Sequence, residues 1–174
     1  KATKVIDFEF IQNTGSTALP LENVKALIMD FDGVFTDNRA LVFEDGREAV
    51  FVSRADGMRI SLLRKVDFPM VVISTERNPV VSVRCKKLKL ECIRGVDDKL
   101  SVLHKWASDK GVDMGQVAYV GNDINDVECM KAVGHSIAVA DAHPSALGIA
   151  NMVLSACGGQ GAIREIVDMI IAAD

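Results

Sequence analysis

The stretch ALIMDFDG at residues 26–33 decides the fold class of this chain of 174 residues. Its first four residues are apolar, as in a strand that is buried on both faces of a sheet, and the run ends at Asp30. Two later stretches have the same form: MVVIS at 70–74 and VAYVGND at 117–123. Helical patterns separate them. Strands alternating with helices predict an α/β fold, with a Rossmann-like, mainly parallel sheet and helices on both faces.

Shorter patterns complete the predicted order of elements. Residues 39–53 predict a β-hairpin, with the turn EDGR between two apolar runs. Only 41 residues separate Asp32 from Ser74 and 24 separate Ser74 from Lys99, so we expect a molecule without a cap domain, with the hairpin inserted after the first strand. The remaining predicted elements are a helix opened near Asp56, helices over 79–88, 99–110, 125–132 and 161–172, short strands near 92–93 and 135–139, and a turn at 141–144.

Residues 1–23 read differently from the rest of the chain. Apolar and acidic residues alternate over 6–10, as in a short strand, and a polar stretch typical of turns follows over 12–17. We therefore predict a tether or N-terminal extension over 1–23 and one folded domain over 24–174. Such a tether would connect the domain to another part of a longer protein.

Composition and charge narrow the classes of partner. The formal net charge is −4, and the densest basic cluster is the short segment 86–89, which is weak for a nucleic-acid-binding surface. No apolar run approaches the roughly 18–20 residues that span a bilayer. The four cysteines form no CxxC pair, so neither a zinc knuckle nor a disulfide framework is indicated. We expect no nucleic-acid partner, no membrane partner and a cytoplasmic location.

Polar side chains follow the predicted buried strands at the points where those strands end. Asp30 and Asp32 follow the first, Ser74 ends the second, and Asn122 follows the third, while Lys99 opens a helix. Ligands of open α/β sheets bind beyond the carboxyl ends of the strands. Carboxylate oxygens placed there suit Mg²⁺, and a lysine beside them offsets the charge of a phosphoryl group. The pattern predicts a magnesium-dependent phosphoryl-transfer site.

These motifs resemble those of a known superfamily. DFDGV at 30–34, Ser74, Lys99 and GNDIND at 121–126 are similar to the four motifs of the haloacid dehalogenase (HAD) phosphohydrolases, and the resemblance covers residues 24–174. Within that superfamily the chain resembles small phosphatases that act on 3-deoxy-2-ulosonate phosphates. It also resembles the C-terminal module of some sialic-acid cytidylyltransferases. The features of this branch are RADG at 54–57, VADAHP at 139–144 and GGQGAIRE at 158–165.

The resemblance implies a role for each matching residue. Asp30 would be the nucleophile and a Mg²⁺ ligand, and an aspartyl-phosphate would form on it. Asp32 would be the general acid and base and would give its main-chain carbonyl to the metal. Ser74, Thr75 and Lys99 would hold the phosphoryl group, with Lys99 also pairing with Asp30. Asn122 stands where active members of the branch usually have a third metal-binding aspartate, which lowers the expected metal affinity. Asp123 and Asp126 are candidates to support it.

The resemblance also implies a substrate and an assembly. Glu76 and Lys87 match the nine-carbon branch, so we predict a 2-keto-3-deoxy-nononate or N-acetylneuraminate 9-phosphate, with the octulosonate 8-phosphate second. Lys87 or Arg84 would pair with the substrate carboxylate. Relatives form homotetramers in which the hairpin packs at the interface and the glycine-rich segment reaches a neighbouring site, a part that 158–164, including Arg164, would play here. The alternative is a weakly active or inactive oligomerisation module of a cytidylyltransferase.

Overall fold

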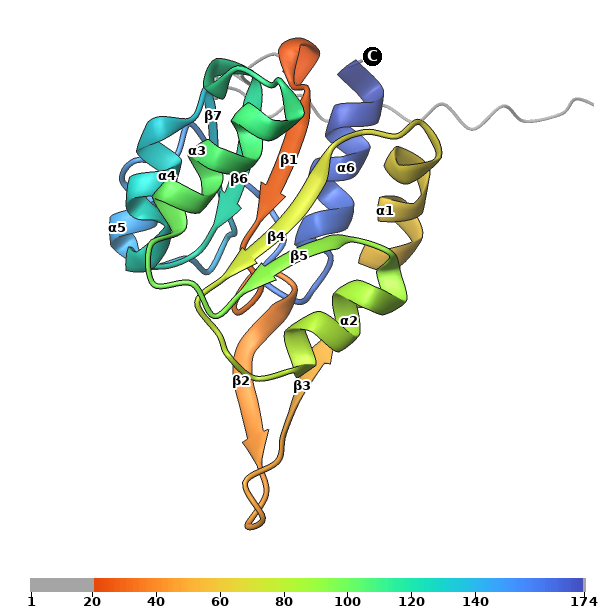
Figure 1. Cartoon of the computed structure of the whole chain (residues 1–174), viewed down its shortest axis with the longest axis vertical. Helices are drawn as coiled ribbons and strands as arrows, with labels where there is room; N and C mark the ends of the chain where they lie inside the picture. Colours follow the sequence, from red (N-terminus) through yellow and green to blue (C-terminus); the bar gives the residue numbers. More distant parts are fainter. Residues whose placement is uncertain (1–20, 174) are drawn as a thin grey trace, which may run out of the picture.

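The computed structural model describes residues 21–173, which form a six-stranded sheet and a separate two-stranded hairpin (Figure 1). The sheet order is β5-β4-β1-β6-β7-β8, and every neighbouring pair is parallel, so the predicted α/β class is confirmed. The strands are β1 (Ala26–Met29), β2 (Thr36–Val42), β3 (Glu48–Val52), β4 (Met70–Ser74), β5 (Glu91–Arg94), β6 (Val117–Gly121), β7 (His135–Ala138) and β8 (Met152–Val153). The helices are α1 (Arg54–Lys65), α2 (Val80–Leu88), α3 (Lys99–Lys110), α4 (Val127–Ala132), α5 (Pro144–Leu147) and α6 (Ala162–Ala173), with 3₁₀ turns at Leu21–Asn23, Met114–Gln116 and Ile124–Asp126.

Strand β1 lies in the middle of the sheet, between β4 and β6. All four of its residues are buried, because helices cover both faces, and this explains its continuous apolar sequence. Met29 is level with Val72 of β4 and with Val120 of β6. The three strands therefore end close to the same height, and the polar residues that follow them are brought together.

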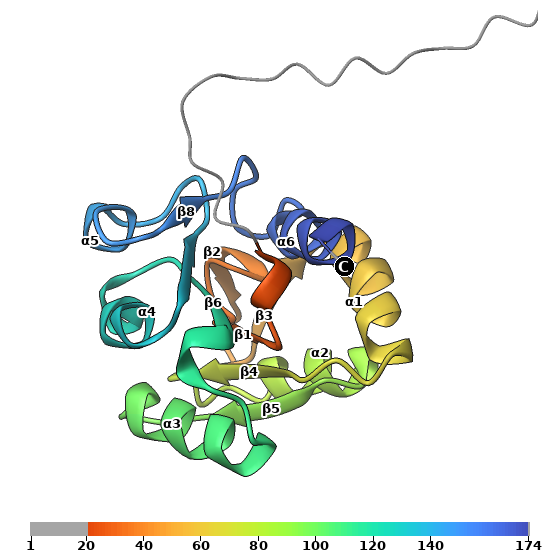
Figure 2. The same cartoon turned by 90° about the horizontal axis from the view of Figure 1, so that it is seen from above.

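Helices lie on both faces of the sheet, as predicted (Figure 2). Helices α1, α2 and α6 cover one face, and α3 and α4 cover the other. Helix α6 packs along α1 and buries Ile163, Ile166, Val167 and Ile170. This spacing gives one apolar stripe along the helix, and the helix predicted over 161–172 is present.

Some predicted boundaries differ from the structure. Helix α4 begins at Val127 rather than 125, because Ile124–Asp126 forms a 3₁₀ turn first. The predicted turn at 141–144 is followed by α5, which was not predicted although Pro144 stands at its first position, where proline favours a helix start. Strand β8 was also missed, since two residues are too few to show a periodic pattern.

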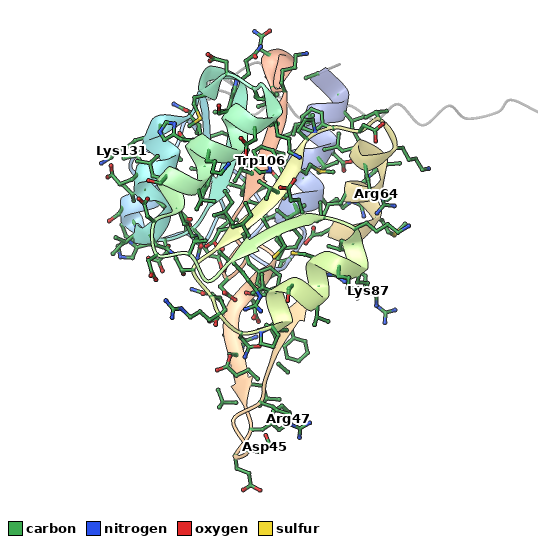
Figure 3. All side chains as sticks on the ribbon, viewed as in Figure 1. Asp45, Arg47, Arg64, Lys87, Trp106 and Lys131 are labelled. Carbon is green, nitrogen blue, oxygen red and sulfur yellow. The ribbon has the colours of Figure 1, made fainter. Side chains whose placement is uncertain are left out.

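The hairpin β2–β3 extends beyond the end of β1, away from the sheet (Figure 1). Its tip carries Asp45 and Arg47 (Figure 3), and Leu41, Val42, Phe43 and Phe51 are exposed on it. Within residues 21–173, the connections that leave β1 and β4 hold only this hairpin and helices α1 and α2. The predicted tetramer, with the hairpin at its interface, stays a prediction.

The folded part begins before residue 24, the predicted boundary. Leu21 and Val24 are buried in the core, and the turn Leu21–Asn23 packs on α6. The predicted strand over 6–10 and most of the predicted tether lie outside the described residues. No helix in the described part of the chain is long and apolar enough to cross a membrane.

Candidate active site

The polar residues that follow β1, β4 and β6 meet in one small pocket. Its volume is about 80 Å³, and it lies where the strands end and the hairpin leaves the sheet. Five residues predicted from the sequence therefore share one site with Asn122. The residues that line it are Asp30, Asp32, Asn38, Ser74, Thr75, Asn122, Asp123 and Asn125.

Lys99 adjoins this pocket through Asp30, and its buried charge lies between two carboxylates. Its side chain is only 2% exposed, and its Nζ lies 2.7 Å from Asp30 Oδ1 and 2.8 Å from Asp126 Oδ1. Although burial by itself lowers the pKa of Lys99, the two carboxylates raise it above its usual value. Lys99 therefore stays charged, and the predicted ion pair with Asp30 is present.

Asp126 is fully buried and supports the site through hydrogen bonds to its neighbours. Its Oδ1 accepts hydrogen bonds from Lys99 Nζ and from the Tyr119 hydroxyl, both at 2.8 Å. Its Oδ2 accepts from the backbone N–H groups of Asn122 at 2.9 Å and Asp123 at 3.3 Å. Both oxygens are occupied, so Asp126 supports the site by holding Lys99 and the backbone of Asn122. A direct role in compensating for Asn122 as a metal ligand does not fit this geometry.

The two catalytic candidates have different surroundings. Burial raises the pKa of Asp30 to about 7, and the Asp126 carboxylate adds to the rise while Lys99 opposes it. Asp32 is partly exposed, and burial followed by the negative charge of Glu76 raises the pKa of its carboxyl. A raised pKa suits a group that donates a proton near neutral pH. Asp30 is in contact with Lys99, and its role as the nucleophile stays a prediction.

Asn122 lines the pocket and is itself almost fully buried. The residue is 6% exposed, and its Oδ1 has no hydrogen-bond partner among the described residues. Gly33 permits its position, since a Cβ on Gly33 would lie 2.0 Å from Asn122 Nδ2 and Gly33 has φ +79°. A buried carbonyl oxygen without a partner costs about 1–3 kcal/mol, which a bound cation would offset. The residues present therefore fit a divalent cation.

The carboxamide of Asn122 means that the candidate metal site contains fewer than three carboxylates. Within residues 21–173, no group of three or more His, Cys, Asp or Glu side chains is placed to hold a metal. Asp30, Asp32 and Asn122 all line the pocket, and Asn122 brings a neutral carboxamide in place of a third carboxylate. We expect a cation site of reduced negative charge, in agreement with the reduced metal affinity predicted from the sequence.

The remaining predicted contacts of the phosphoryl group lie at the end of β4 and directly after it. Ser74 is buried, and its Oγ accepts a hydrogen bond from the backbone N–H of Glu76 at 3.1 Å. Thr75 is exposed at the rim, where Asn125 Nδ2 donates weakly to its Oγ1 at 3.5 Å. Asp123 also lines the pocket, and its Oδ1 accepts from Ile124 N–H to begin the 3₁₀ turn.

The predicted sugar contacts are more dispersed. Glu76 lies close enough to Asp32 to raise its pKa, and its Oε1 accepts a hydrogen bond from Asn78 N–H at 2.6 Å. Arg84 instead donates to the Ser53 carbonyl at 2.8 Å, at the start of α1. Lys87 is exposed on α2, where its side chain points outward (Figure 3). Neither Arg84 nor Lys87 lines the pocket of its own chain.

Arg164 and the glycine-rich segment also lie elsewhere than expected. Arg164 borders a larger, mostly apolar groove of about 800 Å³ along α6, and its backbone N–H donates to buried Asp56. Gly158 and Gly159 pack against residues 33–37 of their own chain. The two glycines thus support the site of their own chain, and the predicted contact of 158–164 with a neighbouring site stays a prediction.

Sequence reasoning missed three residues of the site. Asn38 and Asn125 line the pocket, and Tyr119 holds Asp126 from within β6. Tyr119 belongs to an apolar strand pattern, so nothing in the sequence marks its hydroxyl. Asn125 lies within the recognised GNDIND stretch, and Asn38 has φ +62°, which asparagine adopts more readily than most residues.

Comparisons with known proteins agree with the fold. Residues 71–164 match the family model of haloacid dehalogenase-like hydrolases. The chain belongs to this family and is a phosphatase, a hydrolase of phosphoric monoesters.

The relatives narrow the branch of the family. A 3-deoxy-D-manno-octulosonate 8-phosphate phosphatase from Yersinia pestis is 36% identical over 152 residues, which are 87% of this chain and 81% of the relative. A HAD family hydrolase structure from Streptomyces avermitilis matches with TM-score 0.86 and 45% identity, over 92% of this chain and 94% of the other. The Moraxella catarrhalis octulosonate phosphatase, in complex with magnesium, phosphate and KDO, matches with TM-score 0.85 and 26% identity, over 89% and 90%.

Proposed function

We propose that this chain is a Mg²⁺-dependent phosphatase that releases inorganic phosphate from a 3-deoxy-2-ulosonate phosphate. The observation that carries the proposal is the pocket in which Asp30, Asp32 and Asn122 meet above the buried charge of Lys99. The known substrates named for its relatives support the substrate class. The ion pair of Asp30 argues against a purely structural module, because such a module has no need of a buried carboxylate held by a lysine.

The chain offers three oxygens to a divalent cation. These are the carboxylate of Asp30, the main-chain carbonyl of Asp32 and the orphan Oδ1 of Asn122. When bound, the cation neutralises negative charge on the phosphoryl oxygens. The Moraxella relative contains magnesium with phosphate, which supports Mg²⁺ as the cation.

The side chains divide the reaction between them. An oxygen of the Asp30 carboxylate attacks phosphorus, the bond from phosphorus to the ester oxygen breaks, and the Asp32 carboxyl donates its proton to that leaving oxygen. Asp32, now ionised, then takes a proton from water as the water oxygen attacks the phosphorus of the aspartyl-phosphate. Phosphate leaves, and Asp30 is regenerated as a carboxylate.

Lys99 and Ser74 hold the charge during both steps. Lys99 stays protonated between Asp30 and Asp126, so a positive charge is fixed beside the nucleophile without any reorganisation. Ser74, buried at the end of β4, offers a hydroxyl to a phosphoryl oxygen. Thr75 at the rim is placed to do the same.

The size of the pocket requires most of the substrate to lie outside it. About 80 Å³ is far below the roughly 300–1,000 Å³ of pockets that enclose whole small ligands. The phosphoryl group enters and the sugar chain extends past the rim. Further walls from neighbouring chains, as in the predicted tetramer, would bring residues such as Lys87, Arg84 and Arg164 into contact with it.

Two sugar lengths follow from two different observations. The named relatives act on the eight-carbon octulosonate 8-phosphate, and this makes it the first substrate to test. Glu76, which lies beside Asp32, resembles the glutamate of the nine-carbon branch, and this resemblance makes the nononate or sialate 9-phosphate the second substrate to test.

The test is phosphate release from both substrates with Mg²⁺ and with excess EDTA. We expect release that requires Mg²⁺ and that disappears in the Asp30→Asn variant. Lys105→Gln is a matched control, since Lys105 is exposed on α3 and, among the described residues, pairs only with Asp109. Absence of release from either substrate by a folded, Mg²⁺-loaded protein would refute the proposal.

A further inference from the structure

Asn38 occupies a place in the pocket that no step of the reaction uses. Of the eight residues that line the pocket, only Asn38, Thr75 and Asn125 are exposed, so these three form its rim. None of the three carries a charge. The atoms of the substrate next to the phosphoryl group must pass this rim when the phosphoryl group is bound.

The rim residues differ in how they are engaged. Thr75 and Asn125, which follow β4 and β6, contact each other through Oγ1 and Nδ2. Asn38 comes from β2, in the hairpin that follows the two aspartates. Its carboxamide makes no hydrogen bond within residues 21–173, so both its N–H₂ group and its oxygen are available at the mouth of the pocket.

The backbone around Asn38 holds it in this position. The register of β2 against β3 shifts between Thr36 and Ala40, and Asn38 lies in this bulge with φ +62°. A β-bulge redirects side chains and is common beside active sites. Here the bulge places the Asn38 side chain at the pocket that contains Asp30 and Asp32.

Thr36 connects Asn38 to the turn at Gly33, which directly follows Asp30 and Asp32. Its Oγ1 is fully buried and accepts from Gly33 N–H at 3.1 Å and from Asn38 N–H at 3.2 Å. Gly159 packs beneath this segment so closely that a Cβ there would lie 2.6 Å from the Asp37 nitrogen. The backbone of Asn38 is therefore fixed relative to Asp32.

We propose that Asn38 binds the leaving group, through hydrogen bonds from its carboxamide to the hydroxyl groups next to the ester carbon of a polyhydroxylated substrate. A carboxamide suits this place because it can both donate to and accept from a hydroxyl. A carboxylate at the rim would repel the incoming phosphate dianion. The inference rests on the proposed function and extends it to substrate selectivity.

The test is the Asn38→Gly variant, because glycine adopts the same backbone conformation and removes only the side chain. We expect kcat/KM for the ulosonate phosphates to fall roughly 3- to 10-fold, the size of one neutral hydrogen bond. Turnover of p-nitrophenyl phosphate, whose leaving group has no neighbouring hydroxyl, and inhibition by inorganic phosphate should change less than about twofold, that is by less than half a kcal/mol.

Asp67→Gly is the matched control, since Asp67 has φ +53° in an exposed turn outside the active-site pocket. This variant should leave kcat/KM unchanged for both the ulosonate phosphates and p-nitrophenyl phosphate. An equal loss on both substrates, or no loss on either, in Asn38→Gly would overturn the inference. If wild-type protein releases phosphate only from other esters, the proposed function fails. Asn38→Gly is then compared with wild type on the polyol phosphate that the enzyme hydrolyses best and on p-nitrophenyl phosphate. An equal effect on these two esters, or a wild-type enzyme that hydrolyses no hydroxylated ester, would overturn the inference about Asn38 separately.

Discussion

Replacing Lys99 by methionine should destabilise the protein strongly. Methionine has similar length and removes only the charge, yet it leaves Asp30 and Asp126 facing an apolar group in the buried floor of the site. Lys99 Nζ now lies 2.7 and 2.8 Å from those carboxylates, and its side chain is 2% exposed. Breaking a buried pair by removing one partner costs about 3–5 kcal/mol. For a domain of this size, such a loss lowers the Tm by about 6–20 °C.

The structure also predicts how the stability lost in Lys99→Met depends on the charges of Asp30 and Asp126. In Lys99→Met/Asp126→Asn, only one buried carboxylate is left, so part of the lost stability should return. The loss should also shrink below about pH 4, where Asp30 is protonated in the folded protein and increasingly in the unfolded protein as well. The variant should have no phosphatase activity at any pH.

Urea unfolding in EDTA, at about pH 8 and about pH 3, measures these differences directly. The matched control is again Lys105→Gln, which removes an exposed pair and should cost less than about 1 kcal/mol. A loss below about 1 kcal/mol in Lys99→Met at pH 8 would refute the reasoning, because the buried charges would then not be held by Lys99.

Three further predictions concern the same site. In metal-free protein the pKa of Asp30 is raised from 3.8 to about 7, so the ionisation of Asp30 lowers the stability progressively as the pH rises from about 4 to about 7, and by a constant amount above that. Thermal unfolding in EDTA should therefore find Asp30→Asn more stable than wild type at about pH 8 and equally stable near about pH 4. Asn122→Asp should tighten Mg²⁺ binding roughly tenfold, about 1.4 kcal/mol, in calorimetric titration, and unchanged affinity would exclude Asn122 as a ligand. Gly33→Ala should lose at least about 1–2 kcal/mol of stability together with most activity, because alanine is strained at φ +79° and its Cβ meets Asn122; wild-type turnover would show that this close approach is unnecessary.

Residues 26–33 illustrate which parts of the fold could be predicted from the sequence. A strand that is buried on both faces must be apolar throughout, so β1, β4 and β6 were visible as runs, and the polar residues after them marked the site. Their convergence follows from the parallel arrangement alone. Strand β8 could not be predicted in this way, because its two residues carry no period.

The parts of the site that were missed depend on three-dimensional packing. Tyr119 faces Asp126 because β6 lies beside β1 and the turn after β6 folds back over its own end. Asn38 reaches the pocket through a bulge, and a bulge is a change of register between two strands that no local pattern reveals. The glycine-rich segment was recognised, but its packing against its own chain depends on gaps of atomic size beside Gly33 and Thr36.

The most direct test of the account is to identify the residue that carries phosphate during turnover. Protein mixed with a ulosonate phosphate and Mg²⁺ is quenched in acid, an aspartyl-phosphate is reduced with borohydride, and the peptides are analysed by mass spectrometry. Reduction converts a phosphorylated aspartate to homoserine. The account predicts homoserine at position 30 alone, and its absence in Asp30→Asn. Modification of another residue, or phosphate release in Asp30→Asn at the wild-type rate, would contradict it.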